Sequence, residues 1–113
     1  MTIERNKKAK SKMVILYIDT TDNQKISLAL EIDGRKYKTT KVINTWTSQL
    51  LLPLIREVLK EHKMTVQDIN AVRINPGPGS FTGIRVGLAV ANALGFLLDI
   101  PVNGKKGKLI LPV

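Results

Sequence analysis

The stretch NPGPGSFTGIRVG, residues 75–87, decides the fold of this chain. Two prolines and two glycines lie between Pro76 and Gly79, and an almost uncharged apolar segment follows them. Proline restricts φ and glycine tolerates positive φ, so this composition is typical of a tight turn between a strand and a helix. We expect the helix to run from about Thr82 to Leu98.

Small residues recur at every fourth position of this expected helix: Gly83, Gly87, Ala91 and Gly95. This spacing forms a flat groove along one helix face, which lets another backbone approach closely. Glycine lowers helix propensity by about 1 kcal/mol per residue relative to alanine, so close packing must offset that cost. The pattern therefore predicts a tightly packed contact along the groove.

The opposite helix face predicts a second contact. Its residues are Arg85, Ala89, Asn92 and Phe96, and no charge occurs between Val86 and Leu98. A helix that is apolar nearly all round is normally buried on both sides, and a small domain has few ways to cover both. We therefore expect a partner interface made of Leu50, Leu51, Leu54, Gly83, Gly87, Ala91, Gly95 and Phe96. Arg85 opposes the helix dipole, so we expect it to have an acceptor, either Asp19 or a group of a partner.

Three strands are expected before this region. Residues 13–21 (MVILYIDTT) form a continuous apolar run, which indicates a buried strand. Residues 25–33 alternate between apolar and polar, Asp33-Gly34 favours a hairpin, and residues 36–44 are rich in lysine, as an edge strand often is.

A helix over residues 47–63, capped by Thr47 or Ser48, and short strands over 70–75 and 100–104 complete the pattern. The order β-β-β-α-β-α-β predicts an α/β domain with a mixed five-stranded sheet and packed helices, the order of a ribonuclease-H-like domain.

Length and charge indicate one domain with basic ends. The 113 residues carry 18 Lys and Arg against 9 Asp and Glu. We expect a basic N-terminal tail over residues 1–12, a domain over 13–104, and a short basic and apolar tail over 105–113. Such tails attract polyanions, so both ends are candidates for unspecific RNA contact, while the absence of a long apolar run argues against a membrane span.

Motifs for phosphate, metal or nucleophile chemistry are weak. No lysine follows Gly83, as a P-loop requires, and the glycine spacing misses the dinucleotide pattern by one residue. His62 is the only histidine and cysteine is absent, so we expect neither a metal site nor a protease centre, and we assign His62 to packing at a helix end.

The segments ILYIDTT (15–21), LLPLIREVLKEHK (51–63) and GPGSFTGIR (77–85) closely resemble the bacterial TsaB (YeaZ) family over residues 13–104. The resemblance implies an actin-like ATPase fold and a cytoplasmic, non-catalytic dimerisation subunit without a cofactor of its own. It also implies a TsaD-like catalytic subunit and a TsaE-like ATPase as partners in making threonylcarbamoyladenosine at position 37 of tRNA. The family's helices pack against TsaD or against a second copy.

The resemblance places two loops. The motif loop is Gly77, Pro78, Gly79, Ser80, Phe81, Thr82, Gly83 and Arg85. The degenerate phosphate loop is Asp19, Thr20 and Thr21. Family members usually carry a second actin-like domain, and residues 102–113 do not continue the family pattern, so we expect no complete ATP site. The alternatives are a ribonuclease-H-like hydrolase, for which the carboxylates are too dispersed, and an RNA-binding module, for which aromatic residues are few.

Overall fold

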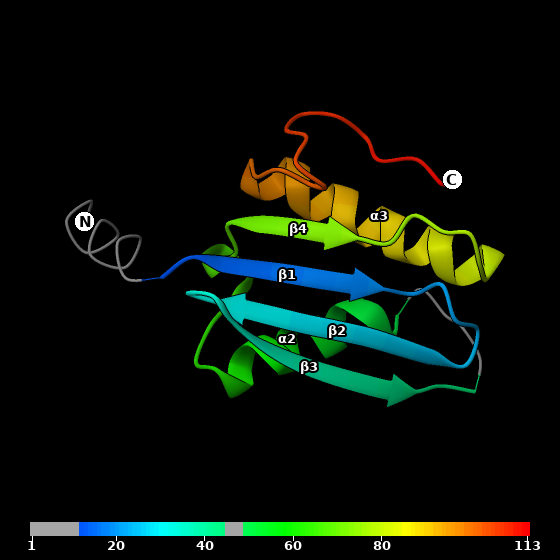
Figure 1. Cartoon of the computed structure of the whole chain (residues 1–113), viewed down its shortest axis with the longest axis horizontal. Coiled ribbons are helices and arrows are strands. Elements are labelled where there is room, and N and C mark those ends of the chain that lie inside the picture. Colours follow the sequence, from blue (N-terminus) through cyan, green and yellow to red (C-terminus); the bar gives the residue numbers. More distant parts are fainter. Residues whose placement is uncertain (1–11, 45–48) are drawn as a thin grey trace.

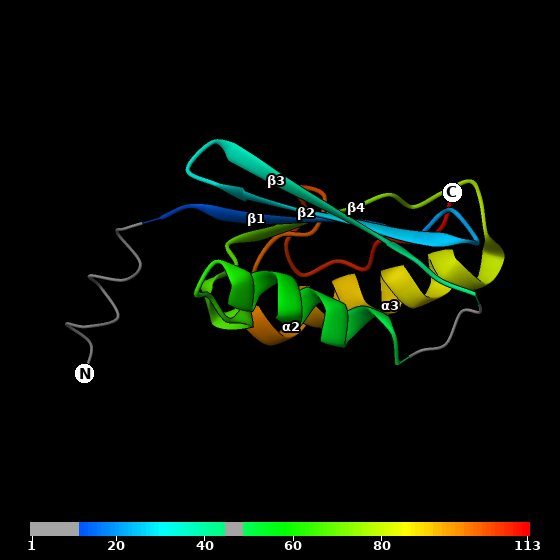
Figure 2. The same cartoon turned by 90° about the horizontal axis from the view of Figure 1, so that it is seen from below.

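The computed structural model describes residues 12–44 and 49–113, which form one sheet with both described α-helices on the same side (Figures 1 and 2). The elements are β1 (Val14–Asp19), β2 (Lys25–Ile32), β3 (Arg35–Val42), α2 (Leu51–Glu61), the 3-10 helix η1 (Val66–Asp68), β4 (Ala71–Ile74) and α3 (Phe81–Leu98). The strand order is β3-β2-β1-β4, with β1 antiparallel to β2 and parallel to β4. The predicted α/β class and mixed sheet are confirmed, and the other face of the described sheet carries no helix.

The expected fifth strand over residues 100–104 is absent from the described part of the chain. Val102 makes one parallel bridge to Val72, and Asn103 then turns away with a φ of 52°. The Asn103 side chain takes the place of the next peptide group: its Oδ1 accepts from Ile74 N at 2.8 Å, and its Nδ2 donates to Ile74 O at 2.9 Å. The edge of β4 is thereby satisfied by an amide side chain, and strand pairing ends there.

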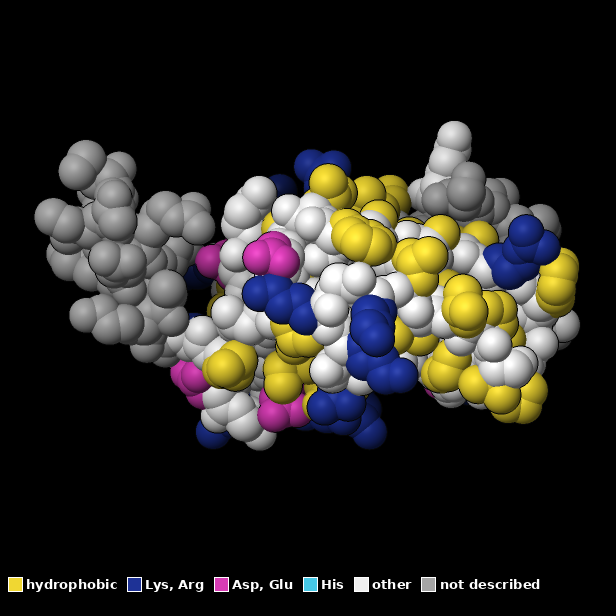
Figure 3. Space-filling model, turned by 90° about the horizontal axis from the view of Figure 1, so that it is seen from above, with side chains coloured by type: hydrophobic (Ala, Val, Ile, Leu, Met, Phe, Trp, Pro, Cys, Tyr) yellow, Lys and Arg dark blue, Asp and Glu magenta, His cyan; other side chains and the backbone are white. Residues whose placement is uncertain are grey.

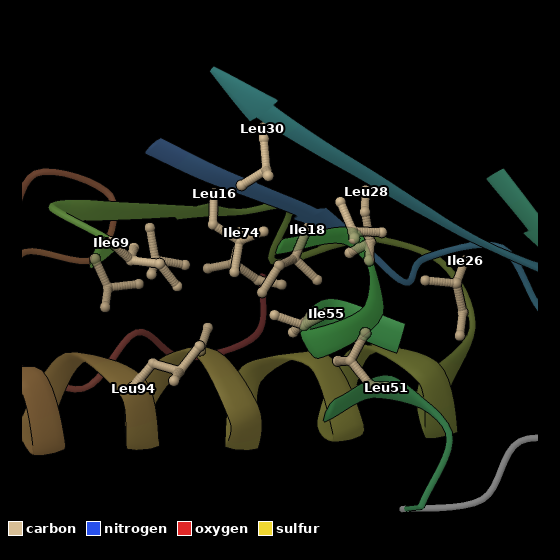
Figure 4. Close-up of a cluster of buried hydrophobic side chains, with 14 of the residues drawn as sticks. Leu16, Ile18, Ile26, Leu28, Leu30, Leu51, Ile55, Ile69, Ile74 and Leu94 are labelled. Atoms are coloured by element: carbon tan, nitrogen blue, oxygen red, sulfur yellow. The ribbon is translucent and has the colours of Figure 1, made fainter. Parts of the chain in front are cut away.

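The core lies between the sheet and the two helices (Figure 4). Alternate residues of β1 point into it because successive side chains of a strand face opposite sides. Leu16, Ile55 and Leu59 are fully buried, and Leu51 at the start of α2 is as well. The predicted caps Thr47 and Ser48 lie outside the described residues, and His62 at the end of α2 packs its ring against Tyr37 with 4.5 Å between ring centroids.

Residues 105–113 return along α3 instead of forming a separate tail (Figure 1). A tight turn joins Val102 and Lys105 through two backbone hydrogen bonds of 3.0 Å. Further on, Ile110 N donates to Asn92 Oδ1 at 2.9 Å, and Asn92 Nδ2 donates to Ile110 O at 3.0 Å. Val113 N donates to Pro76 O at 2.9 Å, so the segment is bonded to α3 through Asn92 and to the loop before α3 through Pro76. The basic residues 1–11 lie outside the described part.

By length and composition alone, α3 is apolar enough to cross a membrane, with a mean hydropathy of 1.6 over 18 residues. A core helix of a soluble protein passes the same test, so this is weak evidence. A third of this window is buried, and the glycines of α3 pack within the chain, Gly87 against Thr20 and Ile74 and Gly95 against Val102.

Candidate functional site

The predicted degenerate phosphate loop and the motif loop meet at the carboxyl ends of β1 and β4. Asp19 Oδ1 accepts hydrogen bonds from Thr21 N at 3.0 Å and from Thr21 Oγ1 at 2.7 Å. Its other oxygen, Oδ2, accepts from Asn75 Nδ2 at 3.0 Å. Partial burial acts to raise the pKa of Asp19, but the hydrogen bonds from Thr21 and Asn75 and the charge of Lys25 outweigh it and hold the pKa below its ordinary value.

The motif loop is bonded to the phosphate loop through its backbone. Ser80 N donates to Thr21 O at 2.7 Å, and Gly79, with a φ of 154°, packs directly against Thr21. Gly77 N donates to Asn75 Oδ1 at 3.1 Å, and Ser80 Oγ caps α3 by accepting from Gly83 N at 3.1 Å. The backbone donors Thr21 N and Ser80 N are therefore both engaged within the chain.

Glycines on α3 form contacts within the chain. A Cβ at Gly87 would overlap Thr20 Oγ1, and a Cβ at Gly95 would lie 2.6 Å from Val102 Cγ2. Gly83 and Ala91 are buried on the same side. This corrects the predicted interface: the groove of small residues, and the buried Leu51, face the chain's own core because α3 lies close against β1 and β4.

The outer face of α3 is apolar and exposed. We define it as Phe81, Arg85, Ala89, Ala93, Phe96 and Leu97, all of which are exposed. Its only charge, the guanidinium of Arg85, lies over the ring of Phe81 at 5.0 Å from the centroid, so Arg85 does not use Asp19 as its acceptor. Of the interface residues predicted from sequence, Phe96 belongs to this face, whereas Leu50 and Leu54 are partly buried against the core.

The sequence pattern placed Ala89 on the helix face opposite the groove. The predicted partner interface nevertheless included neither Ala89 nor Ala93. Ala89 and Ala93 are four residues apart, which is the spacing of the small residues in the groove. The same spacing therefore could have identified the outer face from the sequence. Figure 3 looks onto the side of α3 and the C-terminal segment, where hydrophobic side chains gather among Lys and Arg.

Comparison with known proteins agrees with this geometry. The family model described as "TsaD: tRNA N6-adenosine threonylcarbamoyltransferase" matches residues 44–104. A tRNA threonylcarbamoyladenosine biosynthesis protein TsaB of Buchnera aphidicola subsp. Baizongia pistaciae is 37% identical over 87 residues, which cover 77% of this chain and 39% of that protein. The Escherichia coli K12 protein of the same name is 35% identical over 92 residues, covering 81% of this chain and 39% of its own length.

The structure of YeaZ from Pseudomonas aeruginosa superimposes with a TM-score of 0.73 at 34% identity, covering 80% of this chain and 42% of that one. The chain belongs to the TsaB (YeaZ) family, within the TsaD-like domains. It spans about two fifths of the length of these TsaB relatives. The actin-like, ribonuclease-H-like superfamily agrees with the observed sheet and helices.

In this TsaB-family chain we expect Asp19 to stabilise the fold in a pH-dependent way. Its folded pKa is lowered, so its contribution is present above the unfolded pKa of about 4 and is lost as the pH falls through the folded value. Asp19→Asn should weaken this acid dependence, since the amide cannot titrate. Urea unfolding midpoints at about pH 7, 5, 4 and 3 measure it. Parallel pH profiles for the variant and the wild type would show that the carboxylate contributes nothing.

Proposed function

We propose that this chain is a non-catalytic scaffold in tRNA N6-threonylcarbamoyladenosine biosynthesis, which binds a TsaD-like catalytic subunit through the outer face of α3 and the adjoining part of α2. The names of its TsaB relatives support the pathway. The closed contact between Thr21 and Ser80 supports a structural role for the loop that resembles a phosphate loop. A TsaE-like ATPase would join the assembled pair, and all of these steps would take place in the cytoplasm.

The observation that carries the proposal is the exposure of the outer face of α3. Phe81 is 72% exposed, Phe96 57% and Leu97 81%, although they lie on one helix beside small alanines. Exposed apolar surface of this kind, free of acidic side chains, is characteristic of protein–protein contact. Leu52 on α2 is a further exposed apolar side chain, at 41% exposure.

The alanines suit a close contact between helices. Ala89 and Ala93 let a partner helix approach, while Phe81 and Phe96 supply bulky contacts near the two ends of α3. Because the glycines hold the inner side of α3 against the sheet, the outer face is presented in a fixed orientation. A rigid surface loses little conformational entropy on binding.

Size-exclusion chromatography with and without a TsaD-like subunit tests the proposal. We expect the two chains to elute together as a heteromeric complex, and the modification of tRNA by the TsaD-like subunit to rise when this chain is added. The isolated chain should not hydrolyse ATP in the presence of Mg²⁺. If the chain associates with itself and does not bind the TsaD-like subunit, a homodimer is favoured instead. Tight Mg²⁺-dependent ATP binding by the isolated chain would contradict the non-catalytic role.

A further inference from the structure

The face of the sheet opposite the helices holds a hollow of about 760 Å³. The strand register explains its shape, because one row of side chains crosses this face from β3 to β4. The row consists of Lys38, Ala29, Tyr17 and Arg73. Ala29 is small, and the adjacent position on β2 along the same face is Ser27. The hollow therefore lies over β2, between the lysines of β3 on one side and Tyr17 and Arg73 on the other.

Three cations line this hollow: Lys36, Lys38 and Arg73. Among the described residues no carboxylate pairs with Lys38 or Arg73. The two acids on this face have other partners, since Asp19 accepts from Thr21 and Asn75, and Glu31 accepts from the Tyr17 hydroxyl at 2.8 Å. Lys38 and Arg73 are thus open to an external anion, although the carboxylate of Asp19 lines the same hollow.

Tyr17 lies between these cations as an aromatic platform. The ammonium of Lys36 lies over the face of this ring, 3.9 Å from its centroid, so a stacked base would have to displace the Lys36 side chain. The hydrogen bond to Glu31 raises the pKa of Tyr17, keeps its hydroxyl protonated and fixes the ring on the sheet. A flat ring that is held on a sheet and bordered by cations can stack a base while the cations contact phosphates. The same charges argue against cover by an apolar protein layer, because unpaired cations are costly to bury.

We infer that this open face of the sheet binds a single-stranded segment of RNA, with a base on Tyr17 and phosphates on Lys38 and Arg73. The choice of RNA over another polyanion rests on the proposed function in tRNA modification. This places specific RNA contact on the sheet, whereas the sequence indicated only unspecific contact by the basic ends.

The test uses the full chain and a fluorescein-labelled RNA hairpin with a single-stranded loop, measured by fluorescence anisotropy. Lys38→Ser/Arg73→Ser removes two cations of the hollow, and Lys41→Ser/Lys60→Ser removes two exposed cations elsewhere. If each lost cation contacts one phosphate, the salt slope of log K falls by about 1.4 and affinity falls about 25-fold at 0.1 M salt in the first variant only. Tyr17→Leu should weaken binding about fivefold or more, while Tyr17→Phe should keep most of it.

Equal losses in the two double variants would overturn the inference, since the attraction would then be general charge. Competition by polyglutamate as strong as competition by unlabelled RNA would also overturn it, in favour of a site for acidic peptides. Circular dichroism confirms that each variant is folded. The hollow lies on the face opposite α3, so these variants should still bind the TsaD-like subunit. If the wild-type chain binds the RNA but forms no complex with the TsaD-like subunit, the proposed function is contradicted and the RNA site is not.

Discussion

Gly87→Leu should lower the free energy of unfolding by about 3 kcal/mol and the melting temperature by about 12–24 °C. A Cβ at this position would overlap Thr20 Oγ1 and lie 3.2 Å from Ile74 Cδ1. Leucine is the better helix former by about 0.8 kcal/mol, but the cost of overpacking against β1 and β4 exceeds that gain. Thermal unfolding followed by circular dichroism measures the net effect.

Two comparisons separate packing from helix propensity. Ala89→Leu, on the exposed side of the same helix, should change stability by less than about 0.5 kcal/mol. Gly87→Ala should destabilise the otherwise wild-type chain. The same substitution should cost less in a chain that also carries Thr20→Ala, because Thr20 Oγ1, the atom nearest to the added Cβ, is then absent. If Gly87→Leu melts at the wild-type temperature, α3 does not lie against the sheet as described, and its groove is free for a partner.

The fold was largely predictable because its signals are local. The apolar run of β1, the alternation of β2 and the Asp33-Gly34 hairpin each depend on neighbours in sequence, and the strands formed there. The end of the sheet was not predictable, because Asn103 ends the pairing through a hydrogen bond to Ile74, which lies 29 residues away. Spacing alone gives no sign of such a contact.

The sequence predicted only part of the candidate interface, again because long-range contacts decide the rest. Periodicity showed that α3 has two apolar faces, but it could not say which one meets the chain's own sheet. The choice depends on Thr20, a buried residue whose hydroxyl has no hydrogen-bond partner among the described residues and lies against Gly87. Only glycine leaves room for that contact, so the glycine face turns inward and the alanine face outward.

Ala93→Glu should then weaken binding to a TsaD-like subunit about 100-fold or more, which corresponds to about 2.7 kcal/mol. Ala93 lies on the outer face three and four residues before Phe96 and Leu97, whose side chains are apolar and exposed. A carboxylate buried there would have no partner and would lose its hydration. Isothermal titration calorimetry with the TsaD-like subunit measures the loss.

The fold itself should tolerate this change, because alanine and glutamate are both good helix formers and residue 93 is exposed. Gln24→Glu supplies the matched control, since it adds the same charge at an exposed turn without altering side-chain shape. Ala93→Ser keeps the residue small and should bind within a few fold of the wild type. If Ala93→Glu and Gln24→Glu bind equally well, the outer face of α3 is not the interface, and the scaffold proposal loses the surface on which it depends.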